Sequence, residues 1–218
     1  MLDVLIAAAH PSELEGLHAV LGAGLQKRVR GLRVAARAVG VGMPAAAVGT
    51  LQVLRDTQAR ALVLLGSCGV YGHGLLLTAA VPDRLQLVDA AVIAGQAAIP
   101  DAMQATARAH RGLSAGLAKA AGKALRGTCA TTCGITTSDG LARRLARAGA
   151  GAVENLEGVA VAMACERERV PFAAVLVVTN VVGRKGRRQW LENRVAAAER
   201  GAEILASWLD AGAPGIPA

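Results

Sequence analysis

Short apolar runs that end in polar or glycine-containing turns are the clearest pattern in the chain. Three of them cover residues 2–9, 60–65 and 172–179, and they consist mainly of Val, Leu, Ile and Ala. Runs of this length that are apolar at almost every position are typical of strands buried on both faces of a sheet. We therefore predict buried strands at these three places, and less regular strands at 32–42 and 128–137.

The segments between these strands favour helices. Ser12 is a candidate N-cap for a helix that carries Leu14 and Leu17 on one face, and Pro44 suits the first turn of a helix over 45–54. The repeated order of strand, turn and helix predicts an α/β fold whose sheet is covered on both faces. Further helices are expected at 101–109, 112–125, 138–148, 156–169 and 188–209.

Composition narrows the class of protein. The chain is 53% hydrophobic, which excludes an intrinsically disordered protein, and charge, Gly or Pro breaks every long apolar run, so we expect no membrane partner. Neither a linker nor a change of composition divides residues 1–218, which predicts one domain. The net charge is +8, but the basic residues are scattered and the chain has one Tyr and one Phe. A base-stacking surface is therefore not expected, and we predict no nucleic-acid partner.

The four cysteines, Cys68, Cys129, Cys133 and Cys165, follow no secretory signal, so we expect free thiols in a reducing cytoplasm. Cys129 and Cys133 have the spacing of half a metal site, but no second pair or nearby His completes it. We predict small buried thiols and no bound metal.

Polar residues gather where predicted strands end, which is where ligands bind in open α/β sheets. Glu157 is flanked by Leu156 and Val159, and a carboxylate in apolar surroundings needs a hydroxyl, a cation or a ligand. The alternative is that Glu157 only stabilises the N-terminus of the following helix. With Glu13 and Asn180 it forms a hydrolase constellation, in which one carboxylate activates water, the other binds a diol and the amide stabilises a leaving group.

Five motifs stand in order along the chain: His10-Pro11-Ser12-Glu13, Val41-Gly42-Met43, Gly66-Ser67-Cys68-Gly69, the stretch 153–162 with Val170-Pro171-Phe172, and Thr179-Asn180. Together they resemble the purine nucleoside phosphorylase/nucleosidase superfamily. The most specific is the stretch 153–162 followed by Val170-Pro171-Phe172, which is similar to the family's V-E-M-E-G-x-A-V-A … V-P-F signature with Leu156 in place of Met. The resemblance runs from Val4 to about Leu209 and implies a three-layer αβα fold with a central mixed β-sheet.

The resemblance also implies roles for individual residues. Glu13 matches the base that activates water in the nucleosidase branch, and Glu157 matches the glutamate that binds the ribose hydroxyls. Leu156 is expected to pack against the sugar, and Ser67 to lie near the ribose and the incoming nucleophile. The turn around Ile135 matches the segment whose backbone reads the purine edge. The remaining candidates for substrate binding are Cys68, Gly69 and Thr179.

Departures from the family pattern indicate the nucleophile and the purine. Phosphorylases of the superfamily carry a basic residue where this chain has Leu64, and an apolar side chain cannot offset the charge of a bound phosphate. Leu176 stands where relatives have a substrate-side Arg on the last strand. Asn180 stands where methylthioadenosine-type nucleosidases have an Asp general acid. An amide cannot supply that proton, but it can hydrogen-bond N7 and the 6-position, which suits a 6-oxopurine.

The run 179–184, Thr-Asn-Val-Val-Gly-Arg, followed by Trp190 is similar to the Ser-Asn-x-Val-Gly segment of futalosine hydrolases, with Lys185-Gly186 where an acidic residue is usual. The resemblance implies hydrolysis of futalosine to hypoxanthine in menaquinone biosynthesis, without a cofactor, by a cytoplasmic homodimer or higher homo-oligomer. Arg184 and Trp190 are candidate loop contacts to this anionic purine nucleoside. The alternatives are a methylthioadenosine/S-adenosylhomocysteine nucleosidase, a purine nucleoside phosphorylase and a non-catalytic nucleoside-binding homologue.

Overall fold

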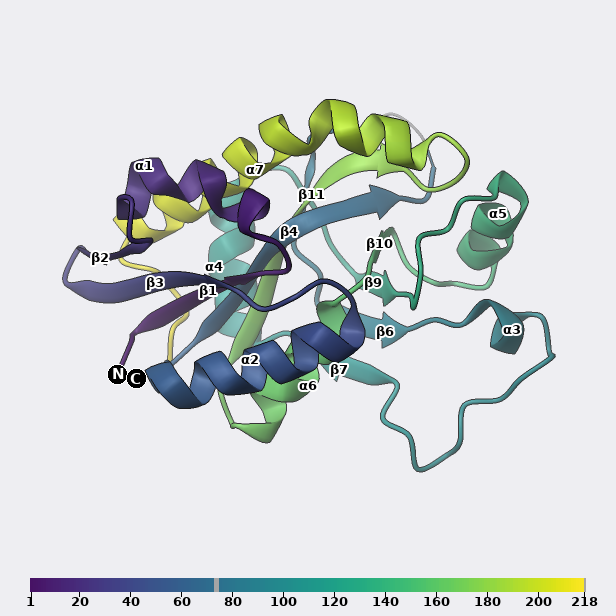
Figure 1. Ribbon diagram of the computed structural model, residues 1–218, viewed down its shortest axis with the longest axis horizontal. Coiled ribbons are helices and arrows are strands. Elements are labelled where there is room, and N and C mark those ends of the chain that lie inside the picture. Colours follow the sequence, from purple (N-terminus) through teal and green to yellow (C-terminus); the bar gives the residue numbers. More distant parts are fainter. Residues whose placement is uncertain (73–74, 218) are drawn as a thin grey trace.

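The computed structural model describes residues 1–72 and 75–217, and its centre is one mixed β-sheet (Figure 1). The strands follow the order β2-β3-β1-β4-β10-β9-β6-β7, while β11 pairs with β4 and with β5, which also pairs with β8. The strands are β1 (Val4–Ala8), β2 (Gln26–Val29), β3 (Leu32–Ala38), β4 (Leu62–Val70), β5 (Ala79–Ala80), β6 (Arg84–Leu87), β7 (Thr106–Arg108), β8 (Ala124–Leu125), β9 (Thr128–Thr131), β10 (Val153–Asn155) and β11 (Phe172–Val181).

Helices cover both faces of this sheet, which confirms the three-layer αβα prediction (Figure 1). Successive side chains of β1 point to opposite faces of the sheet and so contribute to two cores. Val4 and Ile6 belong to the core under α4 and α7, whereas Leu5 and Ala7 belong to the core under α2 and α6. The helices are the 3₁₀ helix η1 (Pro11–Leu17), α1 (His18–Leu21), α2 (Met43–Thr57), α3 (Ala90–Ile93), α4 (Arg111–Ala121), α5 (Asp139–Arg147), α6 (Gly158–Arg167) and α7 (Gly186–Asp210).

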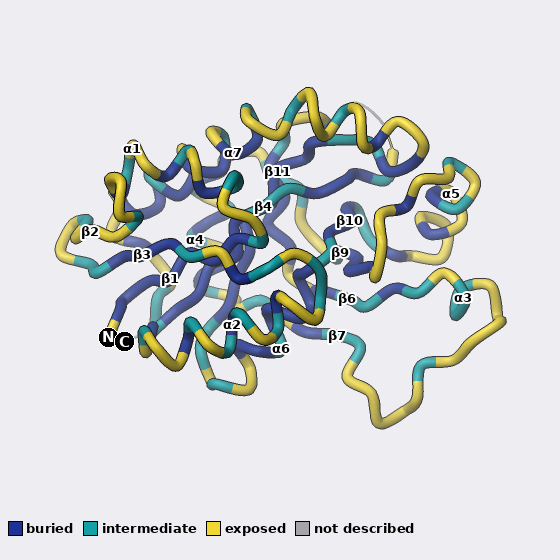
Figure 2. The backbone as a smooth tube through the Cα atoms, viewed as in Figure 1, coloured by how far each residue is buried: buried dark blue, intermediate teal, exposed yellow. Residues whose placement is uncertain are grey.

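The central strands are buried almost throughout, and the helices expose their outer sides (Figure 2). Leu64 on β4 and Leu176 on β11 belong to the core under α2 and α6, with exposed fractions of 2% and 0%. Both side chains therefore pack inside the protein. Within the described residues, no helix has the length and apolar character that crossing a bilayer requires.

One predicted strand extends further than expected, and one predicted helix is replaced by a turn and a strand. The strand predicted to stop at Gly66 continues as β4 to Val70, because β11 pairs with residues 66–70 on one side and β10 with residues 69–70 on the other. The helix predicted over 101–109 is a turn followed by β7, which pairs antiparallel with β6. In both places long-range strand pairing decides the conformation, and the local pattern does not contain it.

Two helix starts also differ from the prediction. His10, not Ser12, caps the first helix: its Nδ1 accepts the Ser12 N–H at 3.2 Å, and the helix begins with a 3₁₀ segment. α6 begins at Gly158, after β10, because the Asn155 side chain accepts the N–H groups of Glu157 and Gly158, each at 2.8 Å. The predicted start of α5 at Ser138 is confirmed, with the hydroxyl accepting the Leu141 N–H.

The four cysteines are free, and Cys68, Cys129 and Cys165 are buried as predicted. Cys133 is exposed, which contradicts the expectation of four buried thiols. Across residues 1–72 and 75–217, no three His, Cys, Asp or Glu side chains are grouped so that they could hold a metal ion.

Candidate active site

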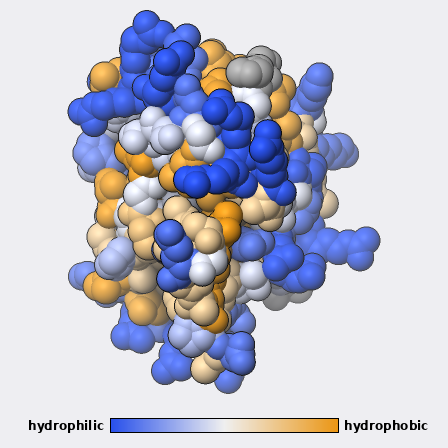
Figure 3. Space-filling view, turned by 90° about the vertical axis from the view of Figure 1, so that its right-hand side faces the viewer, coloured by the Kyte–Doolittle hydropathy of each residue, from blue (hydrophilic) through white to orange (hydrophobic). Residues whose placement is uncertain are grey.

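A cavity of about 420 Å³ lies beside the carboxyl-terminal parts of β4, β10 and β11. It brings together segments from both ends of the chain, as expected where parallel strands end in an α/β sheet. The end of the molecule that carries α3 and α5 shows an apolar centre surrounded by hydrophilic side chains (Figure 3). The sequence-predicted residues that line the cavity are Glu13, Ser67, Cys68, Gly69, Ile135, Leu156, Glu157, Thr179, Asn180 and Trp190.

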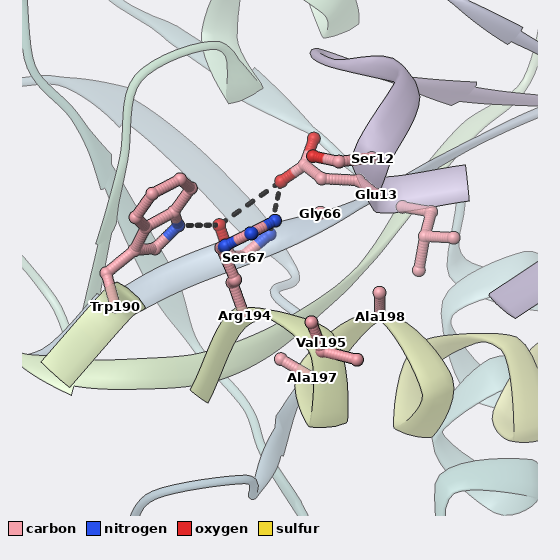
Figure 4. Close-up of a pocket in the computed structure, with 10 residues that line it drawn as sticks. Ser12, Glu13, Gly66, Ser67, Trp190, Arg194, Val195, Ala197 and Ala198 are labelled. Carbon is pink, nitrogen blue, oxygen red and sulfur yellow. Dashed lines mark hydrogen bonds between the residues drawn. The ribbon is translucent and has the colours of Figure 1, made fainter. Parts of the chain in front are cut away.

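The Glu13 carboxylate is held by four donors in the wall of the cavity. Oε2 accepts the backbone N–H groups of Ala9 at 3.1 Å and His10 at 3.3 Å. Oε1 accepts the Ser67 N–H at 3.0 Å and the Ser67 hydroxyl at 3.2 Å (Figure 4). Burial raises the pKa of Glu13, and these hydrogen bonds act in the opposite direction. A raised pKa makes the ionised form a stronger proton acceptor.

Glu157 reaches the same cavity from the start of α6. Its Oε1 accepts the Gly42 N–H at 2.9 Å, which ties α6 to the turn before α2. Its exposed fraction is 5%. Burial is the main cause that raises the pKa of Glu157, the nearby Glu13 charge raises it further, and the Gly42 hydrogen bond lowers it. Asn155 accepts the Glu157 N–H and donates to the carbonyl of Ser67 at 3.1 Å, so it fixes Glu157 relative to β4.

A third carboxylate of the cavity, Glu154, was missed as a site residue although it belongs to the most specific motif. It accepts the N–H of Thr136 at 3.1 Å, the hydroxyl of Thr136 at 2.7 Å and the Tyr71 hydroxyl at 2.7 Å. These bonds hold the turn that presents Ile135, 57% exposed, at the cavity. Glu154 thus positions the segment that the family resemblance predicts to contact the purine edge.

Asn180 enters the cavity at a bulge in β11. The register against β4 shifts between Val178 and Asn180, and a bulge changes the direction of the side chains beside it. The Asn180 Nδ2 donates to the carbonyl of Val181 at 3.2 Å, which fixes the orientation of the amide, and Oδ1 accepts the Thr179 hydroxyl at 2.8 Å. A Cβ on Gly69 would stand 2.9 Å from Nδ2, so this glycine leaves room for the amide.

The basic residues of the cavity come from α7 and not from the preceding loop. Arg184 does not line the cavity: its Nε lies 3.0 Å from Asp139 Oδ2, and its N–H donates to the same carboxylate. Arg187 and Arg194 line it instead, together with Trp190. The sequence signal that could have identified Arg194 is its spacing, because positions 187, 190 and 194 share one helix face.

Trp190 connects this helix face to Glu13. Its indole N–H donates to the Ser67 hydroxyl oxygen at 3.3 Å, and the Arg194 guanidinium carbon lies 5.8 Å from the centre of the indole ring. A smaller cavity of about 20 Å³ adjoins this group and is lined in part by Ser12, Glu13 and Arg194 (Figure 4).

Comparison with known families agrees with the sequence motifs. The model of the phosphorylase superfamily matches residues 11–211, which is most of the chain. The chain belongs to the phosphorylase superfamily. The resemblance inferred from the motifs is thereby confirmed. No curated protein matches the chain significantly by sequence.

Solved structures share the fold at low sequence identity. A mutant of the Helicobacter pylori methylthioadenosine nucleosidase with 5′-methylthioadenosine in its active site has a TM-score of 0.86 and 16% identity, covering 97% of this chain and 99% of that one. A futalosine hydrolase mutant from the same species has a TM-score of 0.86 and 14% identity, covering 97% and 100%. The Neisseria meningitidis methylthioadenosine/S-adenosylhomocysteine nucleosidase, in complex with methylthio-immucillin-A, has a TM-score of 0.81 and 22% identity, covering 95% and 98%.

Proposed function

We propose that the protein is a purine nucleoside N-ribohydrolase. The observation that carries this proposal is the pair of desolvated carboxylates, Glu13 and Glu157, in the wall of one cavity of about 420 Å³. A cavity of this volume accommodates a nucleoside. The solved structures with the same fold include nucleosidases with a nucleoside or an analogue bound, which supports the same class of substrate.

The two carboxylates have different roles at the ribose. Glu157 uses Oε1 for the Gly42 N–H and presents its other oxygen to the 2′ and 3′ hydroxyls, since an ionised carboxylate accepts hydrogen bonds only. Glu13 serves as the general base for the attacking water, and its raised pKa suits it to accept a proton at neutral pH. The transition state resembles a ribosyl oxocarbenium ion, which the negative charges of both carboxylates stabilise.

Asn180 acts on the leaving purine. One hydrogen of its Nδ2 is used for the carbonyl of Val181, and the second is available to a ring nitrogen of the base. A hydrogen bond at that atom stabilises the negative charge that develops as the N-glycosidic bond breaks. Because an amide lacks an acidic proton, this contact favours hypoxanthine as the leaving group over adenine.

Water fits the nucleophile's position better than phosphate does. Leu64, at the position where phosphorylases carry a basic residue, is buried in the core. The nucleophile's position is instead next to Glu13, whose negative charge repels a phosphate dianion. The apolar residue at position 64 and the negative charge of Glu13 support water as the nucleophile.

Futalosine is the proposed substrate because it combines hypoxanthine with a carboxylate. Arg187 and Arg194 are exposed side chains at the α7 wall of the cavity, where they attract an anionic substituent. A neutral 5′ substituent, as in methylthioadenosine, gains nothing from these two charges.

The test measures free base released from futalosine, inosine, adenosine, 5′-methylthioadenosine and S-adenosylhomocysteine in phosphate-free buffer. We expect hypoxanthine release from futalosine, with kcat/KM at least about tenfold above that of methylthioadenosine. A preference for methylthioadenosine overturns the futalosine assignment. Release from none of them overturns the enzyme and favours a nucleoside-binding homologue.

A pair of adjacent arginines tests the role of charge. Arg187 lines the cavity. Arg188 is exposed, and its Nε lies 3.7 Å from Glu192 Oε1 on the same helix. Arg187→Ala is expected to raise KM for futalosine roughly 3- to 10-fold and to leave KM for inosine unchanged, since an exposed ion pair contributes little more. Arg188→Ala is the matched control and changes neither. Equal KM values for all three proteins contradict the proposed contact.

A further inference from the structure

The four acceptor positions of the Glu13 carboxylate are already filled. A carboxylate offers about four lone-pair sites. Three of them accept backbone N–H groups, from Ala9, His10 and Ser67, and the fourth accepts the Ser67 hydroxyl. A water molecule can donate a hydrogen bond to Glu13 only where one of these donors withdraws.

Of the four donors, only the Ser67 hydroxyl can change its partner. The three N–H groups belong to backbone held between β1, η1 and β4, so they stay directed at Glu13. A hydroxyl proton rotates freely and a hydroxyl oxygen both donates and accepts. The single mobile proton at the carboxylate is therefore the one on Ser67.

Trp190 fixes the direction in which that proton points. The indole N–H is a donor only, so in the 3.3 Å contact the Ser67 oxygen must be the acceptor. The hydroxyl proton is then directed at Glu13 Oε1, 3.2 Å away. Figure 4 shows Trp190, Ser67 and Glu13 joined in a row by these two contacts. The second lone pair of the Ser67 oxygen remains for another donor.

Ser67 lies between the two cavities. It lines the large cavity, where the nucleoside is proposed to bind, and the small one of about 20 Å³. A space of that size, with Glu13, Ser67 and Arg194 among its lining residues, holds about one water molecule. A water molecule on either side can donate to the free lone pair of the Ser67 oxygen.

We propose that Ser67 relays the proton of the attacking water to Glu13. The oxygen of the water forms its bond to C1′ of the ribose, and the water proton moves to the Ser67 oxygen as the Ser67 proton moves to Glu13 Oε1. The electron pair of the N-glycosidic bond leaves with the purine. Ser67 ends neutral, Glu13 ends as a carboxylic acid and later returns its proton to the departed base or to solvent. This inference rests on the proposed hydrolase function and adds a catalytic role for Ser67.

Ser67→Ala distinguishes the relay from direct transfer of the water proton to Glu13. With the relay, kcat falls about 10²-fold and KM changes little, because the proton has lost its route. Without it, water already transfers its proton to Glu13 directly, and kcat stays within about threefold of wild type, which overturns the proposal. Ser207→Ala removes an exposed hydroxyl from α7 and serves as the control.

Trp190→Phe keeps an aromatic ring and removes the N–H donor. We expect a smaller fall in kcat, about 3- to 10-fold, with KM unchanged, since the Ser67 proton loses its fixed direction. A kcat equal to that of wild type contradicts the role of Trp190 as a positioning residue.

A proton inventory measures the relay in the unaltered protein. Single-turnover rates in mixtures of H₂O and D₂O curve downward when two protons move together and fall linearly when one moves. A curved inventory for wild type supports the relay, and a linear one or no isotope effect overturns it. If wild type releases no base from any nucleoside, the proposed function fails and the relay with it, whereas activity with a linear inventory overturns the relay alone.

Discussion

Glu13→Gln is the substitution that the structure constrains most tightly. The side chain keeps its length and loses its charge, so any effect reports on the carboxylate itself. The carboxylate accepts four donors, two at each oxygen. A Gln side chain has one acceptor oxygen, and its NH₂ group must face the two donors on the other side.

The expected loss follows from this mismatch. One or two donors left without an acceptor cost about 1–3 kcal/mol each. Removing a partly buried charge returns part of that cost, because desolvation raises the pKa of Glu13 and so disfavours the ionised form. We expect a net loss of about 1–3 kcal/mol in the free energy of unfolding, with a fall in Tm of about 2–4 °C for each kcal/mol. Turnover loses the general base and falls about 10²- to 10⁴-fold.

The assay combines thermal unfolding with the rate of base release at saturating nucleoside. Glu15→Gln is the matched control, because Glu15 lies two residues further along η1 and is exposed. It is expected to change Tm by less than about 2 °C and to leave kcat as in wild type. Turnover of Glu13→Gln within about threefold of wild type would refute the assignment of Glu13 as the base.

Three further substitutions test other parts of the site. Glu157→Gln is expected to raise Tm at pH 7. The raised pKa of Glu157 gives wild type a stability that is complete below the ordinary glutamate pKa and is lost as the pH rises through the raised value. The Tm values of wild type and variant should therefore converge near about pH 4, and a lower Tm of the variant at pH 7 contradicts this. Gly69→Ala brings a Cβ to 2.9 Å from Asn180 Nδ2. We expect the free energy of unfolding to fall by about 1–3 kcal/mol and kcat/KM to fall at least about tenfold. Wild-type values of both would mean that Asn180 moves without cost and that Gly69 is not needed to position it. Arg184→Ala removes an exposed ion pair worth at most about 1 kcal/mol, so kcat/KM should stay within about twofold, and a tenfold fall would place Arg184 in the cavity after all.

Local sequence patterns predicted the features that depend on local physics. The apolar runs became the buried strands β1, β4 and β11, because a strand covered on both faces leaves its residues no polar surroundings. Ser138 caps α5 as predicted, since a cap needs only its own next three residues. Glu157 was recognised as unusual from its apolar neighbours, and its exposed fraction of 5% agrees.

Features that depend on distant partners could not be predicted in this way. The extension of β4 past Gly66 requires β10 and β11, which follow more than eighty residues later. Glu154 looked like part of a motif, and only the structure shows that it holds Thr136 and Tyr71. The basic side chains were assigned to the loop at Arg184, whereas α7 begins at Gly186 and its helical period brings later residues to the cavity.

The most direct test of the central claim identifies the nucleophile. Purified protein is incubated with futalosine or inosine, with and without phosphate, while free base is measured by chromatography and sugar phosphate by ³¹P NMR. The account predicts that base is released at the same rate in both conditions and that no ribose 1-phosphate forms. Base release that requires phosphate, with ribose 1-phosphate formed in equal amount, would contradict it.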